Sequence, residues 1–511
     1  MDGTPITTRP LTPEVRRQLA SLPTKLFYGF GSVAFGVKDN GFQYFLLFFY
    51  SQVLGVPALS VGTAIFIALV IDAFADPIVG QFSDNLRTRL GRRHPLMYAA
   101  AIPAAIAYYF VWNPPALSPN AMFYYLIGIA IVSRTFITMY EIPSSALVAE
   151  LTPDYDQRTS FLSFRYFFGW MGGIAVNLLA FAVFFAATKQ YPIGQLNPEG
   201  YSKYAIASCI LIVLAILVSA RGTQKFVPYF AMPPKRNITL GQVLREAAET
   251  VRNRSFVVLL TSAVFSAVAG GTLTALNNHF NTFFWGLSAA QITWFTVFVI
   301  IAPFIALFIT TPIGALLGKK RAAITLWILS TAIYWIPMAA RLAGVFPPNG
   351  SPWMVPLLVF LQTTGTTLSI ACSITISSML ADVVEDSALR TGRRSEGLFF
   401  AANAFVQKAV SGAGPLVAGF LLTALVHFPE HANPATLDPQ IPRNLALVFF
   451  SVSFALYAVA LGCLSFYRID RAAHEENVRK LAAEGLRAPV AVGAEGLHTP
   501  EHGDPADSIA R

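Results

Sequence analysis

Residues 61–84 read VGTAIFIALVIDAFADPIVGQFSD, and this stretch decides the fold. Its apolar run is as long as a membrane-spanning helix, yet Asp72 and Asp76 lie near its middle. A carboxylate at the centre of a bilayer costs at least roughly 2.5–3.5 kcal/mol, so it needs a partner or a function. Four residues apart, the two aspartates share one face of the helix and repel each other unless a cation joins them. The stretch therefore predicts a membrane helix that carries a cation site, as in an ion-coupled carrier.

The composition of the whole chain is that of a multi-pass membrane protein. Of its 511 residues, 55% are hydrophobic and only 12% are charged, whereas a soluble protein has about 25% charged residues. The three cysteines lie inside apolar runs, which excludes a disulfide framework or a cysteine metal site. The seven histidines are scattered, so we expect no enzyme and no cofactor beyond a coupling ion. Polar residues 1–24 precede a long first apolar run, so no cleavable signal peptide is expected.

The apolar stretches predict twelve transmembrane helices and an all-α fold. They lie near residues 26–54, 60–83, 95–112, 121–149, 160–187, 203–220, 255–285, 291–317, 322–341, 353–380, 397–427 and 444–467.

The loops between these spans alternate sharply in charge. The basic set is 84–95, 221–254, 318–321 and 381–396, and the opposite set is nearly free of Lys and Arg. The positive-inside rule then places both termini in the cytoplasm, with the chain in the plasma (inner) membrane. The net charge of +9 is explained by this topology and requires no nucleic-acid partner.

The longest polar interior stretch divides the spans into two bundles of six. Pro77 and Gly80 in the second span are echoed by Pro312 and Gly314 in the eighth, which predicts two related bundles with a substrate site between them. Thr311 stands where the first bundle has Asp76, so the cation site is expected in the first bundle only. The expected parts are a cytoplasmic segment 1–24, a bundle 25–221, a linker 222–254 with a short helix capped by Thr239 and Gln242, a bundle 255–468, and a partly disordered tail 469–511.

Polar residues inside the first and fourth spans are candidates for substrate binding. Asp39 and Gln43 share one face of the first span. The alternative is a structural pair of Lys38 with Asp39, which is disfavoured because neighbouring residues of a helix do not face each other. Arg134, Thr138 and Glu141 lie on one face of the fourth span. This stripe indicates either a surface that contacts substrate or a salt bridge inside the bundle.

Three further spans carry polar residues with two interpretations each. Arg165 in the fifth span either lines the cavity or extends to the membrane surface. Asn277 in the seventh span, and the threonines of the tenth, suit hydroxyl recognition or helix–helix hydrogen bonding. Lys408 lies too deep in the eleventh span to reach the surface easily, so we expect it to pair with Asp72 or Asp76 across the bundle interface.

A separate set of charges recurs at matching loop positions of both halves. We interpret it as a cytoplasmic gate whose contacts between the bundles form and break during transport; the alternative is topological charge alone. The set comprises Asp84, Arg92, Arg93, Glu150, Arg158, Asp382 and Arg393.

The motifs together resemble the glycoside–pentoside–hexuronide:cation symporters of the major facilitator superfamily, over roughly residues 25–470. The resemblance rests on GVKDN in the first span, DAFADPIVGQFSDN followed by GRRHP, EIPSSALVAELTPDYDQRTSF, DVVEDSALRTGRRSEGLFF, and VQKAVSG. It implies a major-facilitator fold of two six-helix bundles that transports by alternating access. We expect a monomer whose partners are the bilayer and a small molecule, a sugar or glycoside.

The resemblance also implies roles for individual residues. Asp72 and Asp76 match the family's cation-binding carboxylates, and Thr138 matches a hydroxyl that assists them. Asp39 and Arg165 match residues that contact the sugar. Lys408 matches the lysine that links the cation and sugar sites.

Departures from the family pattern change what is expected of the substrate and ion. Glu141 replaces an aspartate, and Ser145 replaces a tryptophan that stacks on the sugar. Ala75 replaces an asparagine whose oxygen would help to bind sodium, so we favour H+ over Na+. Arg134 has no expected counterpart and could recognise an acidic sugar. The alternatives are a cation-coupled carrier of lysophospholipids or other amphiphiles, and a membrane sensor or scaffold that transports nothing.

Overall fold

The computed structural model describes residues 12–152, 155–230, 254–391, 406, 408 and 410–467. Within these residues all regular secondary structure is helical, and ten helical spans are long and apolar enough to cross a membrane. They are α5 (Ala58–Asn85), α6 (His94–Trp112), α7 (Pro119–Leu151), α8 (Tyr155–Leu179), α9 (Pro198–Gln224), α11 (Arg254–His279), α12 with α13 (Ala289–Val299 and Ala302–Leu317), α14 (Lys319–Leu342), α15 (Met354–Thr391) and α18 (Gln440–Ser465).

The remaining two predicted spans account for the expected twelve. After the short helix α1 (Pro13–Leu19), the first span is assembled from α2 (Leu22–Phe30), α3 (Val33–Asn40), α4 (Leu46–Phe48) and two π-helical turns. The eleventh span includes α17 (Ala413–Phe420) and the π-helical turn that follows it. The predicted cap at Thr239 and Gln242, and the tail beyond residue 467, lie outside the described residues.

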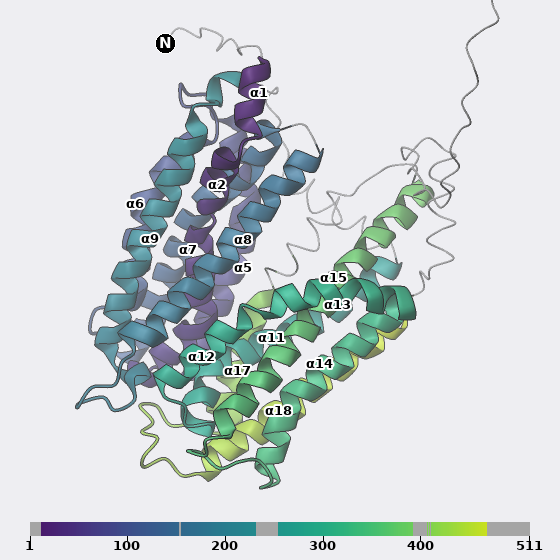
Figure 1. Cartoon of the computed structure of the whole chain (residues 1–511). Helices are drawn as coiled ribbons and strands as arrows, with labels where there is room; N and C mark the ends of the chain where they lie inside the picture. The colour runs from purple at the N-terminus through teal and green to yellow at the C-terminus, as the bar shows by residue number, and fades with distance from the viewer. Residues whose placement is uncertain are drawn as a thin grey trace, which may run out of the picture.

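Helices α1 to α9 form one half of the molecule, and α11 to α18 form the other. Figure 1 shows the halves side by side at the end where α12 and α17 lie, and apart at the end where α1 begins the described chain. Contacts of α17 with α5, and of α11 with the first span, join the halves at the closed end. Since α5 starts at the closed end, the basic loop 86–93 that follows it lies at the open end.

The internal repeat predicted from the sequence is visible in the backbone. Pro77 lies inside α5 and Pro312 inside α13, at matching positions of the two halves. The glycines of the loops that follow, Gly91 and Gly318, have φ of 80° and 73°. A side chain is disfavoured in this left-handed conformation, which explains why both halves have glycine there.

Five-residue π-helical stretches mark further matching positions. They end the first and fifth spans and also the seventh and eleventh, which are their counterparts six spans later. Such stretches are rare in proteins and are enriched at functional sites. Their repetition supports two related bundles independently of the sequence motifs.

Candidate functional site

The two aspartates of α5 form an ion pair with a lysine from the opposite half of the protein. Lys408 Nζ lies 2.6 Å from Asp76 Oδ2 and 3.0 Å from Asp72 Oδ2. Lys408 belongs to the eleventh span, which packs against α5. The contact predicted from the depth of Lys408 is therefore present, and it bridges the two halves inside the apolar part of the spans.

Helix α7 supplies two more donors to the same carboxylates. Arg134 donates through Nε and Nη2 to Asp72 Oδ2, at 2.9 and 2.7 Å. The Thr138 hydroxyl lies 2.9 Å from Asp72 Oδ1 and 3.3 Å from Asp76 Oδ1. With Lys408 at the remaining Asp76 oxygen, each of the four carboxylate oxygens faces at least one donor.

Arg134, predicted either to contact substrate or to form a salt bridge inside the bundle, pairs with Asp72. The residue is only 4% exposed, and its guanidinium donates to Asp72 in α5. The physical reason is that α5 and α7 pack directly against each other, so the desolvated Asp72 carboxylate recruits the nearest cation. The alternative of a salt bridge inside the bundle is thus the observed one, with Asp72 as the partner instead of Glu141.

A correction concerns Lys38 in the first span. Lys38 Nζ lies 2.8 Å from Asp39 Oδ1 and 3.9 Å from Glu141 Oε2, although adjacent residues of a helix point about 100° apart. The flexible four-carbon side chain of lysine is long enough to turn back toward its neighbour. Lys38 is 2% exposed. The sequence signal for a site residue here is a lysine near the centre of an apolar span, where a charge needs a partner.

Arg165 connects α8 to α7 close to Glu141. Its guanidinium donates to Ser144 Oγ at 2.7 Å and to the Glu141 carbonyl oxygen at 3.4 Å, and it lies 4.8 Å from the centre of the Phe35 ring. It is buried, so it does not extend to the membrane surface. The side chains of Asp39 and Glu141 remain 41% and 27% exposed, which leaves carboxylate oxygens free to accept hydrogen bonds from a solute.

Polar residues from both halves surround a small cavity beside this cluster. Asn277 accepts a hydrogen bond from Asn281 at 2.9 Å, and both line a space of about 100 Å³ together with Asn40, Tyr44, Asn177 and Gln362. Gln43 in the first span is exposed. Hydrogen-bonding groups of this kind lie inside membrane spans where they meet water or a polar ligand.

The described geometry is that of a transporter: a polar site between two related helical bundles, bridged by an ion pair. A family model described as MFS/sugar transport protein matches residues 27–471. The chain belongs to this family. Among its solved relatives in fold, the nucleoside transporter NupG (D323A mutant) superposes with a TM-score of 0.58 at 17% identity, covering 87% of this chain and 100% of that one. This likeness confirms the major-facilitator fold.

Proteins of similar sequence are symporters and transporters. The chain is 25% identical to an uncharacterized symporter of Synechocystis sp., over 90% of this chain and 96% of that protein. It is 22% identical to the isoprimeverose transporter of Lactiplantibacillus pentosus, over 89% and 91%. It is 21% identical to the sodium-dependent lysophosphatidylcholine symporter 1-A of Danio rerio, over 91% and 89%.

Four predicted gate residues of this MFS protein, Asp84, Arg92, Arg93 and Glu150, contact each other within the first half. Glu150 Oε1 accepts from Arg92 at 2.7 Å, and Asp84 Oδ1 lies 3.0 Å from Arg93, which also contacts Glu150. Arg158 lies in the first turn of α8, while the side chain of Asp382 and all of Arg393 lie outside the described residues. Contacts between the bundles at this gate therefore stay a prediction.

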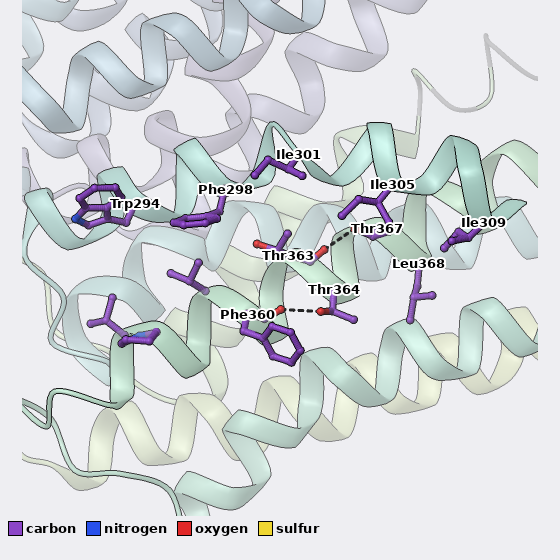
Figure 2. A pocket seen from close by; sticks show the side chains of 13 residues that line it. Trp294, Phe298, Ile301, Ile305, Ile309, Phe360, Thr363, Thr364, Thr367 and Leu368 are labelled. Carbon is purple, nitrogen blue, oxygen red and sulfur yellow. Dashed lines mark hydrogen bonds between the residues drawn. The ribbon is translucent and has the colours of Figure 1, made fainter.

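Three threonines of α15, Thr363, Thr364 and Thr367, face a different surface of the MFS fold. They line an apolar groove of about 770 Å³ between α15 and α12–α13, where Trp294, Phe298 and Phe360 are labelled in Figure 2. Thr364 and Thr367 donate to carbonyl oxygens of their own helix, at 2.8 and 2.9 Å. Their hydroxyls are thus used within α15, and the groove contains none of the predicted site residues.

Proposed function

We propose that this protein is a secondary active transporter that moves a sugar or glycoside together with a cation by alternating access. The observation that carries the proposal is the ion pair between Lys408 and the two aspartates of α5, because it joins the two halves at the predicted cation site. An ion that neutralises Asp76 would release Lys408 and so couple ion binding to movement of one half against the other.

The orientation follows from the loop charges. The open end carries the basic loop 86–93, which the positive-inside rule assigns to the cytoplasm. The described conformation is then inward-facing, with both termini in the cytoplasm and the chain in the plasma membrane.

The substrate site is proposed at Asp39, Glu141 and Arg165, with Gln43 and Asn277 nearby. Carboxylates that remain partly exposed inside a membrane protein suit the many hydroxyl donors of a sugar. The isoprimeverose transporter is a relative whose name points to the same substrate class. The lysophosphatidylcholine relative keeps an amphiphile as the alternative, but the asparagine and glutamine side chains that line the described cavity, Asn40, Asn177, Asn277, Asn281 and Gln362, favour a solute with many hydroxyl groups.

The test is transport by purified protein in lipid vesicles. A proton gradient is imposed, in sodium-containing and sodium-free buffer, and isoprimeverose, other glycosides, hexuronides and lysophosphatidylcholine are supplied in turn. With one proton moved per sugar, a tenfold proton gradient supports up to about tenfold accumulation, since each tenfold ratio corresponds to about 1.4 kcal/mol. Addition of the substrate should also change the pH of the bath.

Matched variants identify the coupling residue. Asp76→Asn should abolish accumulation against the gradient, whereas Thr311→Val, at the matching position of the second half, should accumulate like the wild type. Accumulation by Asp76→Asn equal to the wild type would refute the coupling assignment. A protein that moves none of the supplied solutes, and that tolerates loss of Asp76 and Lys408 in the cell, would instead be the sensor or scaffold.

A further inference from the structure

The predicted cation site of this protein already holds positively charged side chains, those of Arg134 and Lys408. A sodium ion requires several oxygen ligands, and a positively charged side chain fixed on one of those oxygens repels the ion. Here Arg134 and Lys408 both lie against Asp72 Oδ2, and Thr138 donates to Oδ1. Ala75, between the aspartates, offers no side-chain oxygen. The residues present do not fit a sodium ion.

The two basic partners of Asp72 differ in whether movement of one half of the protein against the other would separate them from Asp72. Lys408 comes from the other half of the protein, its side chain is 23% exposed, and rocking of the halves would carry it away. Arg134 lies in the same half as Asp72, on a helix packed against α5, and its side chain is 5% exposed. It also donates through two nitrogens, Nε and Nη2, to one oxygen of Asp72.

We propose that Arg134 is a built-in counter-cation of Asp72 that determines the ion selectivity of the carrier by excluding sodium. Arg134 holds Asp72 in every conformation in which α5 and α7 move as one body. When Lys408 moves away, Asp76 loses this basic partner, whereas Asp72 keeps Arg134. The Phe42 ring, centred 5.4 Å from the guanidinium carbon, covers one face of Arg134 and restrains its position. This inference deepens the proposed function and rests on it only for the meaning of ion coupling.

The experiment measures ion binding without any substrate. Thermal unfolding of the purified full-length protein is followed in detergent, in sodium chloride and in choline chloride at equal ionic strength. The wild type should melt at the same temperature in both salts. Arg134→Ser combined with Ala75→Asn removes the fixed cation and adds an oxygen ligand, so sodium should raise its melting temperature by about 2 °C or more. Sodium-22 retention on the same samples reports binding directly.

Two controls separate ion selectivity from general destabilisation. Arg165→Ser with Ala75→Asn removes another buried arginine, one that contacts Ser144 and not Asp72, and should show no sodium effect. Arg134→Gln, a milder change, is measured in case the double variant does not fold, and a weaker sodium response is expected. The proposal is overturned if sodium specifically stabilises the wild type, or if the folded Arg134 variants bind no sodium.

The outcomes distinguish this inference from the proposed function. If the vesicle experiment shows proton-driven sugar uptake but the wild type binds sodium, only the role of Arg134 fails. If no sugar is transported but the Arg134 variants gain a sodium response, the counter-cation assignment stands and the substrate proposal fails.

Discussion

At the scale of single residues, burial decides how much each charge matters. Glu150 and Asp84 both accept hydrogen bonds or ion pairs from the arginines of loop 86–93, but the side chain of Glu150 is 8% exposed and that of Asp84 is 50% exposed. A buried carboxylate needs charged or hydrogen-bonding partners to compensate for its lost hydration. If the carboxylate is removed, the buried charges of those partners are in turn left uncompensated. An exposed carboxylate is solvated by water and screened by salt.

We therefore predict that Glu150→Gln destabilises the protein by about 3 kcal/mol, because Arg92 and Arg93 lose the charge that compensates their burial. Asp84→Asn, which touches the same arginines, should cost less than about 1 kcal/mol. Chemical unfolding of the purified protein measures both. Equal losses for the two variants would show that the exposure difference has no energetic consequence.

A histidine is buried at the closed end among aromatic side chains. Neither ring nitrogen of His279 has a hydrogen-bond partner within the described part of the chain, and the ring packs among Phe48, Phe283 and Phe428. Replacing it with phenylalanine removes two unsatisfied polar atoms and keeps the aromatic packing. We predict that His279→Phe is stabilising by about 1 kcal/mol, whereas His279→Ala, which leaves a cavity, is destabilising by about 3 kcal/mol. Thermal unfolding of both variants checks the prediction, and a loss of stability in His279→Phe would reveal a hydrogen bond that this packing hides.

At the scale of helices, small residues bring the two halves into backbone contact. A Cβ added to Gly62 of α5 would lie 2.4 Å from the Pro415 carbonyl oxygen, and one added to Gly419 would lie 2.3 Å from that of Ala58. Such close approach of helices is typical of packing between membrane spans, where small residues replace the hydrophobic effect as the source of contact. The closed end of the protein is therefore held in part by close backbone packing, in addition to side-chain hydrogen bonds such as the one from Asn278 to the Tyr44 carbonyl oxygen.

A larger residue at this contact should separate the helices. We predict that Gly62→Val disfavours the described conformation by about 1–3 kcal/mol, because neither backbone can give way. Gly128→Val in α7, where a Cβ would meet nothing within 4 Å, is the matched control for helix propensity. The populations are read from distances between spin labels placed across the closed end. An unchanged distance distribution in Gly62→Val would contradict the prediction.

At the scale of the whole molecule, the open end exposes one face of α15 to solvent. Ser369, Ser373 and Ser377 recur on this face and are exposed, whereas Thr375 is 4% exposed. If the halves close during transport, this serine face must lose its access to water. Accessibility of these positions therefore reports the conformational cycle.

With the three native cysteines replaced, we predict that Ser373→Cys reacts readily with a water-soluble maleimide. Substrate together with the coupling ion should slow this reaction several-fold, because the carrier then populates the closed and outward-facing states. Thr375→Cys, two residues further on, should react slowly in every condition. A Ser373→Cys rate that substrate and ion leave unchanged would argue against alternating access in this protein.

The twelve spans and the repeat could be predicted because their causes are local. An apolar run of about 20 residues must cross the bilayer, and loop charge fixes its direction whatever the other spans do. The pairing of Lys408 with Asp72 and Asp76 could also be predicted. A lysine deep in one bundle needs an acidic partner, and the aspartates of α5 are the strongest candidates.

The sequence by itself thus determined the helical spans, the two bundles and the charged residues that need partners. Only the tertiary structure decided which partner each charge takes. The sequence left open whether Arg134 faces substrate or a carboxylate, and the structure pairs it with Asp72. The pair of Lys38 with Asp39 was the less favoured alternative, and it is present. Spacing along a helix gives the face on which a side chain lies, but the energy of a buried charge depends on what the neighbouring helix places against that face.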